Sequence, residues 1–581
     1  MSFVARPFFR SISQPMTRLT AYFCSAVGAC TVVSLLWGQI GEFRPRDVIV
    51  RAEFLSDSKT SDGRHSKKSP VASPSFGNQV SGFEVGPAIH FVALSAGVDK
   101  HAPVDPVEAN GPIFVDWPKP NVLLVFSGDQ DGYLEPCGCA GLQNQKGGLK
   151  RRHTLLKELE ARGWPIVAMD LGGQVRRFGK QAELKFERTY QSLEEMGYAA
   201  VGFGTHDLRM DLLPVAINLD PEKSILVSAN VGILDFESGF SRRYKVIEVN
   251  AMRIGVTSVL GKTEIAQLQN LEDVVIENPD QAISQVLPDL KGEQCDQMVL
   301  LVYADRKEAE DLARRFPAFD WVVAAKGADE PPNAPTPIKN QSGKTITQLV
   351  EVGHKGMYVV AVGLYKNATP AFRYQRVPVD HRFKDSPEME EIFVGYQDEL
   401  KTLGLAGLGL NAIEHPSGRR FAGSEVCADC HGTASQIHEH TPHAHATKTL
   451  VDLDPSRQYD PECLSCHTTG WHPQNYFPFV SGYRSLEKTP QLTSNGCENC
   501  HGPAKRHADV EYGNIDVEEK EQEELREELR LQIVDNEGNM EGQVFKPGSV
   551  VEMCIECHDL DNSPDFDFQA YWPNVEHRGK D

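Results

Sequence analysis

The sequence predicts a chain of several domains, in which a layered α/β domain precedes a mostly helical and irregular domain. Its 581 residues are more than one hydrophobic core usually supports. Short apolar runs alternate with amphipathic segments between about residues 120 and 380, which is typical of a layered α/β domain. The last third is instead poor in strand signals and contains 12 of the 19 histidines, so we expect it to be a separate cofactor domain.

The first 45 residues predict an export signal. Arg6, Arg10 and Arg18 precede a mostly apolar stretch from Ala21 to Ile40, and that order is typical of a signal peptide. The stretch is also long enough for a spanning helix, and no clear small-residue cleavage site follows it. We therefore favour an uncleaved signal anchor at 1–45 over a cleaved peptide. Residues 46–118 are rich in Ser, Lys, Pro and Gly, which predicts a flexible linker.

Residues 119–380 predict the α/β domain. Apolar runs indicate strands at Val122–Phe126, Ile166–Met169, Ala199–Phe203, Ile225–Val227, Ile254–Val259, Val299–Val302, Trp321–Ala324 and Val359–Leu364. Apolar residues at helical spacing predict helices at Gly148–Ala161, Ala182–Met196 and Arg306–Phe316. Residues 381–420 follow as a connector that includes a helix.

The domain predicted at 421–581 contains four Cys-x-x-Cys-His sequences. Two thiols three positions apart can form thioethers to one haem, and the adjoining histidine can reach its iron. We expect four covalently bound haem c groups, attached at Cys427 and Cys430, Cys463 and Cys466, Cys497 and Cys500, and Cys554 and Cys557, with proximal ligands His431, His467, His501 and His558. The alternative is a pair of zinc ribbons, although zinc does not need a histidine after every second cysteine.

The residues between these motifs carry a family resemblance. The four motifs are followed by Thr441-Pro442-His443-Ala444, Thr468-Thr469-Gly470, Gly502-Pro503 with His507, and Tyr571-Trp572 with His577. In spacing and order this region resembles the tetrahaem cytochrome c-554 family and its multihaem relatives. The resemblance implies a tetrahaem cytochrome domain of about 160 residues.

A second histidine on each iron would fill its coordination and suit electron transfer, whereas an open position would permit substrate chemistry. We expect His443, His507 and His577 as distal ligands. The fourth stays open between His472, which is a weak candidate, the cluster of His438, His440 and His445, and a five-coordinate haem.

A second family resemblance is carried by five segments of the α/β domain, at 127–136, 147–152, 170–173, 204–207 and 228–231. These segments resemble the calcineurin-like metallophosphoesterases, especially the 5′-nucleotidase branch. The resemblance implies a centre of two metal ions, but several ligands of that centre are replaced. Asp131 stands in place of a histidine, Gly173 in place of the bridging aspartate and Thr205 in place of an asparagine, and the later histidines are absent at 303–305 and 326–329. The remaining Asp129, Asp170 and His206 could hold at most one weakly bound divalent ion.

Cys137 and Cys139 lie in the first loop of this phosphoesterase-like frame. They could bind a soft metal or form redox-active sulfur chemistry, and the alternative is a structural disulfide or two buried thiols. We expect Cys295 to be a core thiol.

The composition excludes one class of partner. A formal charge of −22 argues against binding nucleic acid. We expect an exported protein, in the periplasm or on the outer face of the cytoplasmic membrane, that transfers electrons between redox partner proteins. The alternatives are a multihaem oxidoreductase that acts on a small nitrogen or sulfur compound at an open haem, and a residual phosphoesterase or ligand sensor coupled to the haems.

Overall fold

The structure is a computed structural model that describes residues 104–136, 145–212, 220–269, 271, 273–366, 368–531, 550–563 and 566–580. The expected export signal at 1–45, nearly all of the expected linker, and Cys137 and Cys139 lie outside these residues. None of the helices described is both long enough and apolar enough to span a lipid bilayer.

The segment before the first strand folds against the α/β domain. Helix α2 (Pro106–Asn110) begins after Asp105, whose carboxylate accepts two backbone N–H groups of the first turn. Phe114 is buried, and its ring packs edge-on against Trp164 with 5.3 Å between ring centres. The expected linker at 46–118 therefore ends before α2, because Phe114 is part of the main core.

The first sheet of the α/β domain has five strands in the order β13-β12-β1-β2-β3. Its members are β1 (Val122–Ser127), β2 (Ile166–Asp170), β3 (Ala200–Val201), β12 (Tyr358–Leu364) and β13 (Phe372–Pro378). β1 pairs in parallel with β2, so the last residues Ser127 and Asp170 lie side by side. A parallel pair needs a crossover connection, which α3 (Leu149–Ala161) supplies.

The second sheet has six strands in the order β10-β11-β9-β8-β6-β5. Its members are β5 (Lys245–Val249), β6 (Met252–Leu260), β8 (Gln297–Asp305), β9 (Trp321–Lys326), β10 (Thr336–Lys339) and β11 (Thr345–Glu351). The four central strands are parallel and the two edge strands are antiparallel. Helices α7 (Pro279–Gly292) and α8 (Arg306–Arg315) connect parallel neighbours.

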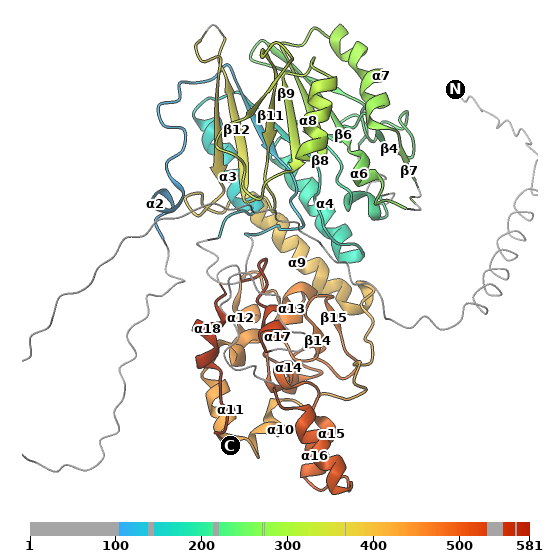
Figure 1. Cartoon of the computed structure of the whole chain (residues 1–581), viewed down its shortest axis with the longest axis vertical. Coiled ribbons are helices and arrows are strands. Elements are labelled where there is room, and N and C mark those ends of the chain that lie inside the picture. Colours follow the sequence, from blue (N-terminus) through green and yellow to red (C-terminus); the bar gives the residue numbers. More distant parts are fainter. Residues whose placement is uncertain are drawn as a thin grey trace, which may run out of the picture. The chain divides into compact units, whose positions relative to one another are not determined.

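Alternate residues of β8 face two different cores, as the period of two along a strand requires. Val299, Leu301 and Tyr303 belong to the main core, which they share with the first sheet. The residues between them belong to a second core beneath α7 and α8. The main core also takes in the apolar faces of α3, α4 (Lys180–Glu195) and α9 (Pro387–Gly407). Helices, two sheets and helices thus form layers (Figure 1), which confirms the predicted layered α/β fold.

Two predicted strands are reduced in the structure. The strand predicted at 199–203 shortens to β3, and the one predicted at 225–227 forms only isolated bridges, from Leu226 to Val201 and from Val227 to Arg242. Both lie where the first sheet ends and the chain crosses to the second. The short strands β4 (Val231–Ile233) and β7 (Val274–Ile276) pair there with each other.

The C-terminal region (residues 421–580) is mostly short helices and loops, as predicted. Its helices are α10 (Ser424–Ala428), α11 (Gly432–Glu439), α12 (Ala446–Asp452), α13 (Pro461–His467), α14 (Cys497–His501), α15 (Lys505–Glu511), α16 (Glu519–Glu528), α17 (Val550–Ile555) and α18 (Phe568–Tyr571). Its strands β14 (Trp471–His472) and β15 (Phe477–Pro478) have two residues each. Its hydrophobic cluster contains only seven buried residues, so little of this region is held by a side-chain core.

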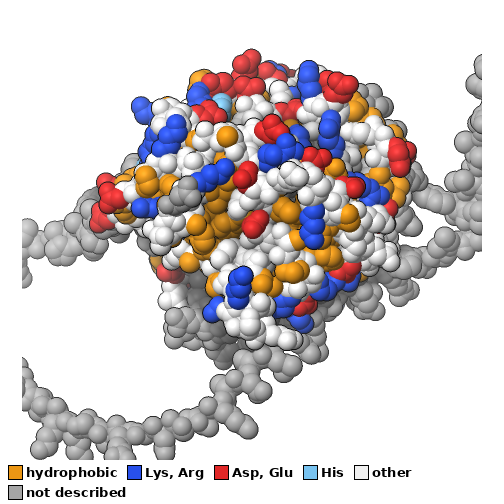
Figure 2. All heavy atoms as spheres, turned by 90° about the horizontal axis from the view of Figure 1, so that it is seen from above, with side chains coloured by type: hydrophobic (Ala, Val, Ile, Leu, Met, Phe, Trp, Pro, Cys, Tyr) orange, Lys and Arg blue, Asp and Glu red, His pale blue; other side chains and the backbone are white. Residues whose placement is uncertain are grey.

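Acidic and basic side chains are interspersed over the face of the molecule drawn in Figure 2. The net charge of −22 is therefore not gathered as one acidic surface on that face.

Candidate functional site

Each Cys-x-x-Cys-His sequence forms a helical turn. In the first, the N–H groups of Cys430 and His431 donate to the carbonyl oxygen of Cys427, at 3.2 and 2.9 Å, and the fourth repeats both bonds. The second and third lie within α13 and α14. Positions i, i+3 and i+4 share one face of a helix, so the two thiols and the imidazole of each motif face the same side. All nine cysteines that the structure describes have free thiols.

Three of the four expected proximal histidines are oriented by a hydrogen bond at Nδ1. The acceptors are the carbonyl oxygen of Ala446 for His467 (2.9 Å), the carbonyl oxygen of Leu529 for His501 (2.7 Å), and the hydroxyl of Ser563 for His558 (3.0 Å). Such a bond holds the ring and leaves Nε2 as the available metal ligand. These acceptors have no sequence signature, and sequence reasoning missed them.

Two expected proximal histidines face a second histidine ring. The ring centres of His501 and His577 are 5.8 Å apart, and those of His443 and His558 are 6.0 Å apart. Two metal–nitrogen bonds of about 2 Å and two ring radii of about 1 Å add up to about 6 Å, so each pair has room for one iron between its rings. His577 also donates from Nδ1 to the carbonyl oxygen of Val575, at 3.0 Å. The residues present therefore fit haem ligated by two histidines.

Burial favours the neutral form of four of the expected ligands, His443, His467, His501 and His558, and the neutral form is the one that binds a metal. Burial lowers the pKa of His443 to about 4, with a further contribution from His558. Burial also lowers the pKa of His467, His501 and His558.

The remaining expected ligands differ in their surroundings. His507 lies close enough to His431 for their charges to interact, and its Nδ1 is 3.8 Å from Glu511. His472 packs instead on Phe477, with 5.1 Å between ring centres, and contacts the amide of Asn475. Among the described residues, no ring contact joins His467 to a second histidine.

A buried carboxylate joins the first and third motifs. Glu498 accepts hydrogen bonds from the N–H groups of Ala422, Gly423 and Ala504 at 2.7 to 3.0 Å, from both sides of its own motif. The thiols of Cys427 and Cys497 lie within hydrogen-bonding distance of each other. Sequence reasoning missed Glu498, because it occupies a position of Cys-x-x-Cys-His at which any residue is allowed.

Comparison with known proteins agrees with this geometry. Residues 426–502 match the family model described as cytochrome c554 and c-prime. The C-terminal region contains a cytochrome c554 domain. A segment of 98 residues is 34% identical to cytochrome c-554 of Nitrosomonas europaea. The matched segment covers 15% of this chain and 39% of that protein. The chain thus spans about two fifths of the length of this relative. The family implies covalently bound haem c and electron transfer, which favours haem over the zinc-ribbon alternative.

A buried tyrosine contacts Asp129, the first of the three remaining candidate metal ligands of the α/β domain. The hydroxyl of Tyr303 donates to Asp129 at 2.7 Å, and both side chains are buried. Gly173 has a φ of +77°, and a Cβ built there would lie 2.6 Å from Oδ1 of Asp129 and 2.7 Å from the Tyr303 hydroxyl. The side chain of a bridging aspartate would therefore collide with both.

The other acidic residues of this centre are engaged by the protein itself. Asp170 accepts from Ser127, from the backbone of Gly172 and from Gln174, at 2.5 to 2.9 Å. Asp207, which sequence reasoning missed, accepts four backbone N–H groups at 2.8 to 3.2 Å, from Gly173, Gln174, Val175 and Gly204. Asp207 therefore organises the two loops on which metal ligands would stand.

Two cationic side chains, Lys326 and Arg209, lie near His206. Lys326 lies 5.2 Å from the ring centre of Tyr303 and 3.5 Å from Glu264. Burial lowers the pKa of His206, and Arg209 and Lys326 lower it further. Across the residues that the structure describes, no group of three or more His, Cys, Asp and Glu side chains is placed to hold a metal ion.

The α/β domain is similar in fold to solved phosphoesterases. Its relatives include a 5′-nucleotidase precursor from Thermus thermophilus (20% identity, TM-score 0.42), which matches over 48% of this chain and 59% of the other. A sulfate thiohydrolase of the same organism has 13% identity, a TM-score of 0.39, and coverage of 49% and 62%. NAD nucleotidase of Haemophilus influenzae has 14% identity, a TM-score of 0.39, and coverage of 52% and 64%.

Proposed function

We propose that this protein is an exported tetrahaem c-type cytochrome that transfers electrons between redox partner proteins, and that its α/β domain is a scaffold without phosphoesterase activity. The facing histidine pairs support this proposal most directly, since two imidazoles on one iron favour electron transfer over substrate binding. Bound haem would supply the redox-active iron. The chain would supply the thiols, the axial imidazoles and the Nδ1 acceptors.

Mass spectrometry of the mature protein tests the proposal. We expect the mass to exceed that of the polypeptide by four haems, and the intact mass to show whether residues 1–45 are retained as an anchor. Two haems or fewer would refute it. Incubation with Mn²⁺ and a nucleoside monophosphate should release no phosphate, because Tyr303 engages Asp129 and an aspartate at position 173 would meet both side chains.

One observation favours a second function. His467 has a well-oriented ring, but no ring contact in the described part of the chain pairs it with another histidine. An open iron at this motif would allow a multihaem oxidoreductase acting on a small nitrogen or sulfur compound. Binding of CO by one haem of the reduced protein, together with turnover of such a compound, would favour this function over simple electron transfer.

A further inference from the structure

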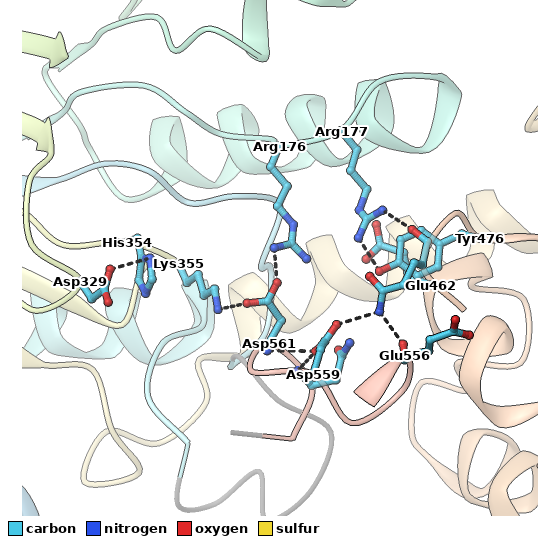
Figure 3. A network of polar contacts seen from close by, with 12 residues as sticks. Arg176, Arg177, Asp329, His354, Lys355, Glu462, Tyr476, Glu556, Asp559 and Asp561 are labelled. Atoms are coloured by element: carbon cyan, nitrogen blue, oxygen red, sulfur yellow. Dashed lines mark hydrogen bonds and ion pairs between the residues drawn. The ribbon is translucent and has the colours of Figure 1, made fainter. Parts of the chain in front are cut away.

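A set of charged and polar contacts joins the α/β domain to the loop that follows the fourth Cys-x-x-Cys-His motif (Figure 3). Arg176, in the loop between β2 and α4, and Lys355, in the loop between β11 and β12, both bind the carboxylate of Asp561. Burial opposes ionisation of Asp561, but the hydrogen bonds from Lys355 and Arg176 outweigh it and lower its pKa to about 2. The carboxylate is therefore ionised at neutral pH and lies between two cations.

A second branch of these contacts reaches the same loop. Arg177 donates to the hydroxyl of Tyr476 and to the carbonyl oxygen of Gln474 (3.3 Å), and its guanidinium lies 3.8 Å from the centre of the Tyr476 ring. Gln474 in turn donates to the carboxylate of Asp559, at 3.1 Å. Two neighbouring arginines of one loop thus restrain the segment that begins with Asp559.

The restrained segment ends at the acceptor for a proximal histidine. Asp559 accepts the N–H groups of Asp561 and Asn562, at 3.0 and 2.7 Å, and its carbonyl oxygen accepts the N–H of Ser563, at 2.8 Å. The Ser563 hydroxyl is 3.0 Å from Nδ1 of His558. Asp561 stands in the middle of this turn, so its position determines where Ser563 can meet the ring.

We propose that Arg176 and Lys355 of the α/β domain, by holding Asp561, position Ser563 against His558 and so set the reduction potential of the haem attached at Cys554 and Cys557. This inference rests on the proposed haem attachment. An acceptor at Nδ1 makes an axial histidine a stronger donor, which stabilises oxidised iron and lowers the potential. Loss of the acceptor should raise it. Asp561, Arg176 and Lys355 are positioning residues in this scheme.

The test is a charge-balanced variant, Arg176→Gln with Asp561→Asn, which removes one cation and one anion. Redox titration and electron paramagnetic resonance of the purified holoprotein should show the potential of one haem raised and its signal altered, while the other three are unchanged. Ser563→Ala should raise the potential of the same haem, and its addition to the charge-balanced variant should have no further effect. Arg176→Lys should retain the wild-type potential.

The matched control is Arg243→Gln with Glu277→Gln, which removes a paired arginine and glutamate elsewhere in the α/β domain and should leave all four potentials unchanged. Full additivity of the charge-balanced and Ser563→Ala effects would overturn the proposal, as would wild-type potentials in the charge-balanced variant. If that variant does not fold, Arg177→Gln, which removes the contacts to Gln474 and Tyr476, should raise the same potential by less, and no shift would again overturn it. A wild-type mass with two haems or fewer would instead refute the proposed function.

Discussion

Replacement of His577 by alanine should open one iron of the cytochrome domain. The ring of His577 faces His501 at 5.8 Å and is oriented by its bond to Val575. Its side chain is only half-buried, so we expect the variant to fold and to attach its haems. With four haems, loss of one distal ligand should make about a quarter of the total haem able to bind CO.

The assay is titration of the dithionite-reduced protein with CO, with the bound amount compared with total haem from the pyridine haemochrome spectrum. His577→Ala should bind one CO more than the wild type, and His443→Ala should do the same at the haem of His558. His354→Ala is the control, because that histidine belongs to the α/β domain, where its Nδ1 lies 3.8 Å from Asp329. Unchanged CO stoichiometry in both variants would refute the assignment of the facing pairs.

Three further predictions concern stability. Gly173→Ala should lower the free energy of unfolding of the α/β domain by about 2–5 kcal/mol, the sum of left-handed strain and overpacking against Tyr303, and a Tyr303→Ala background should reduce that loss in urea denaturation. Asp207→Ala should cost about 3 kcal/mol or more because it leaves buried N–H groups without acceptors, whereas Asp207→Asn, which keeps one acceptor oxygen, should cost less. The pKa of Asp561 is lowered to about 2, whereas the unfolded value is about 4. The contribution of Asp561 to the free energy of unfolding is therefore complete above the unfolded value and is lost as the pH falls through 2. Asp561→Asn should abolish this part of the acid unfolding profile, measured by circular dichroism.

The sequence predicts those elements whose apolar residues follow a simple pattern. The six residues of β1 are all buried, and α8 has its apolar residues on one face, so both match the simplest patterns. The edge strand β13 is missed because most of its residues are half-exposed and polar. Helix α7 is missed because Pro279 at its start and Pro288 inside it are signals that usually end a helix.

The candidate site likewise contains some features that the sequence predicts and others that only the structure shows. Covalent attachment and the proximal ligands depend on contiguous residues, so Cys-x-x-Cys-His is sufficient to predict them. The orientation of those ligands depends on carbonyl groups such as those of Ala446 and Leu529, which any residue could supply at that place in the fold. The clash at Gly173 also requires the structure, because Tyr303 is 130 residues away in sequence.

The loop between β2 and α4 carries both Gly173 and the arginines that contact the cytochrome domain. Gly173 stands where the phosphoesterase resemblance implies a bridging aspartate, and Arg176 and Arg177, three and four residues later, bind the cytochrome domain. Arg176 of this loop holds the carboxylate of Asp561 together with Lys355, which lies in the loop between β11 and β12. These contacts therefore fit the proposal that the α/β domain is a support for the segment that follows the fourth Cys-x-x-Cys-His motif.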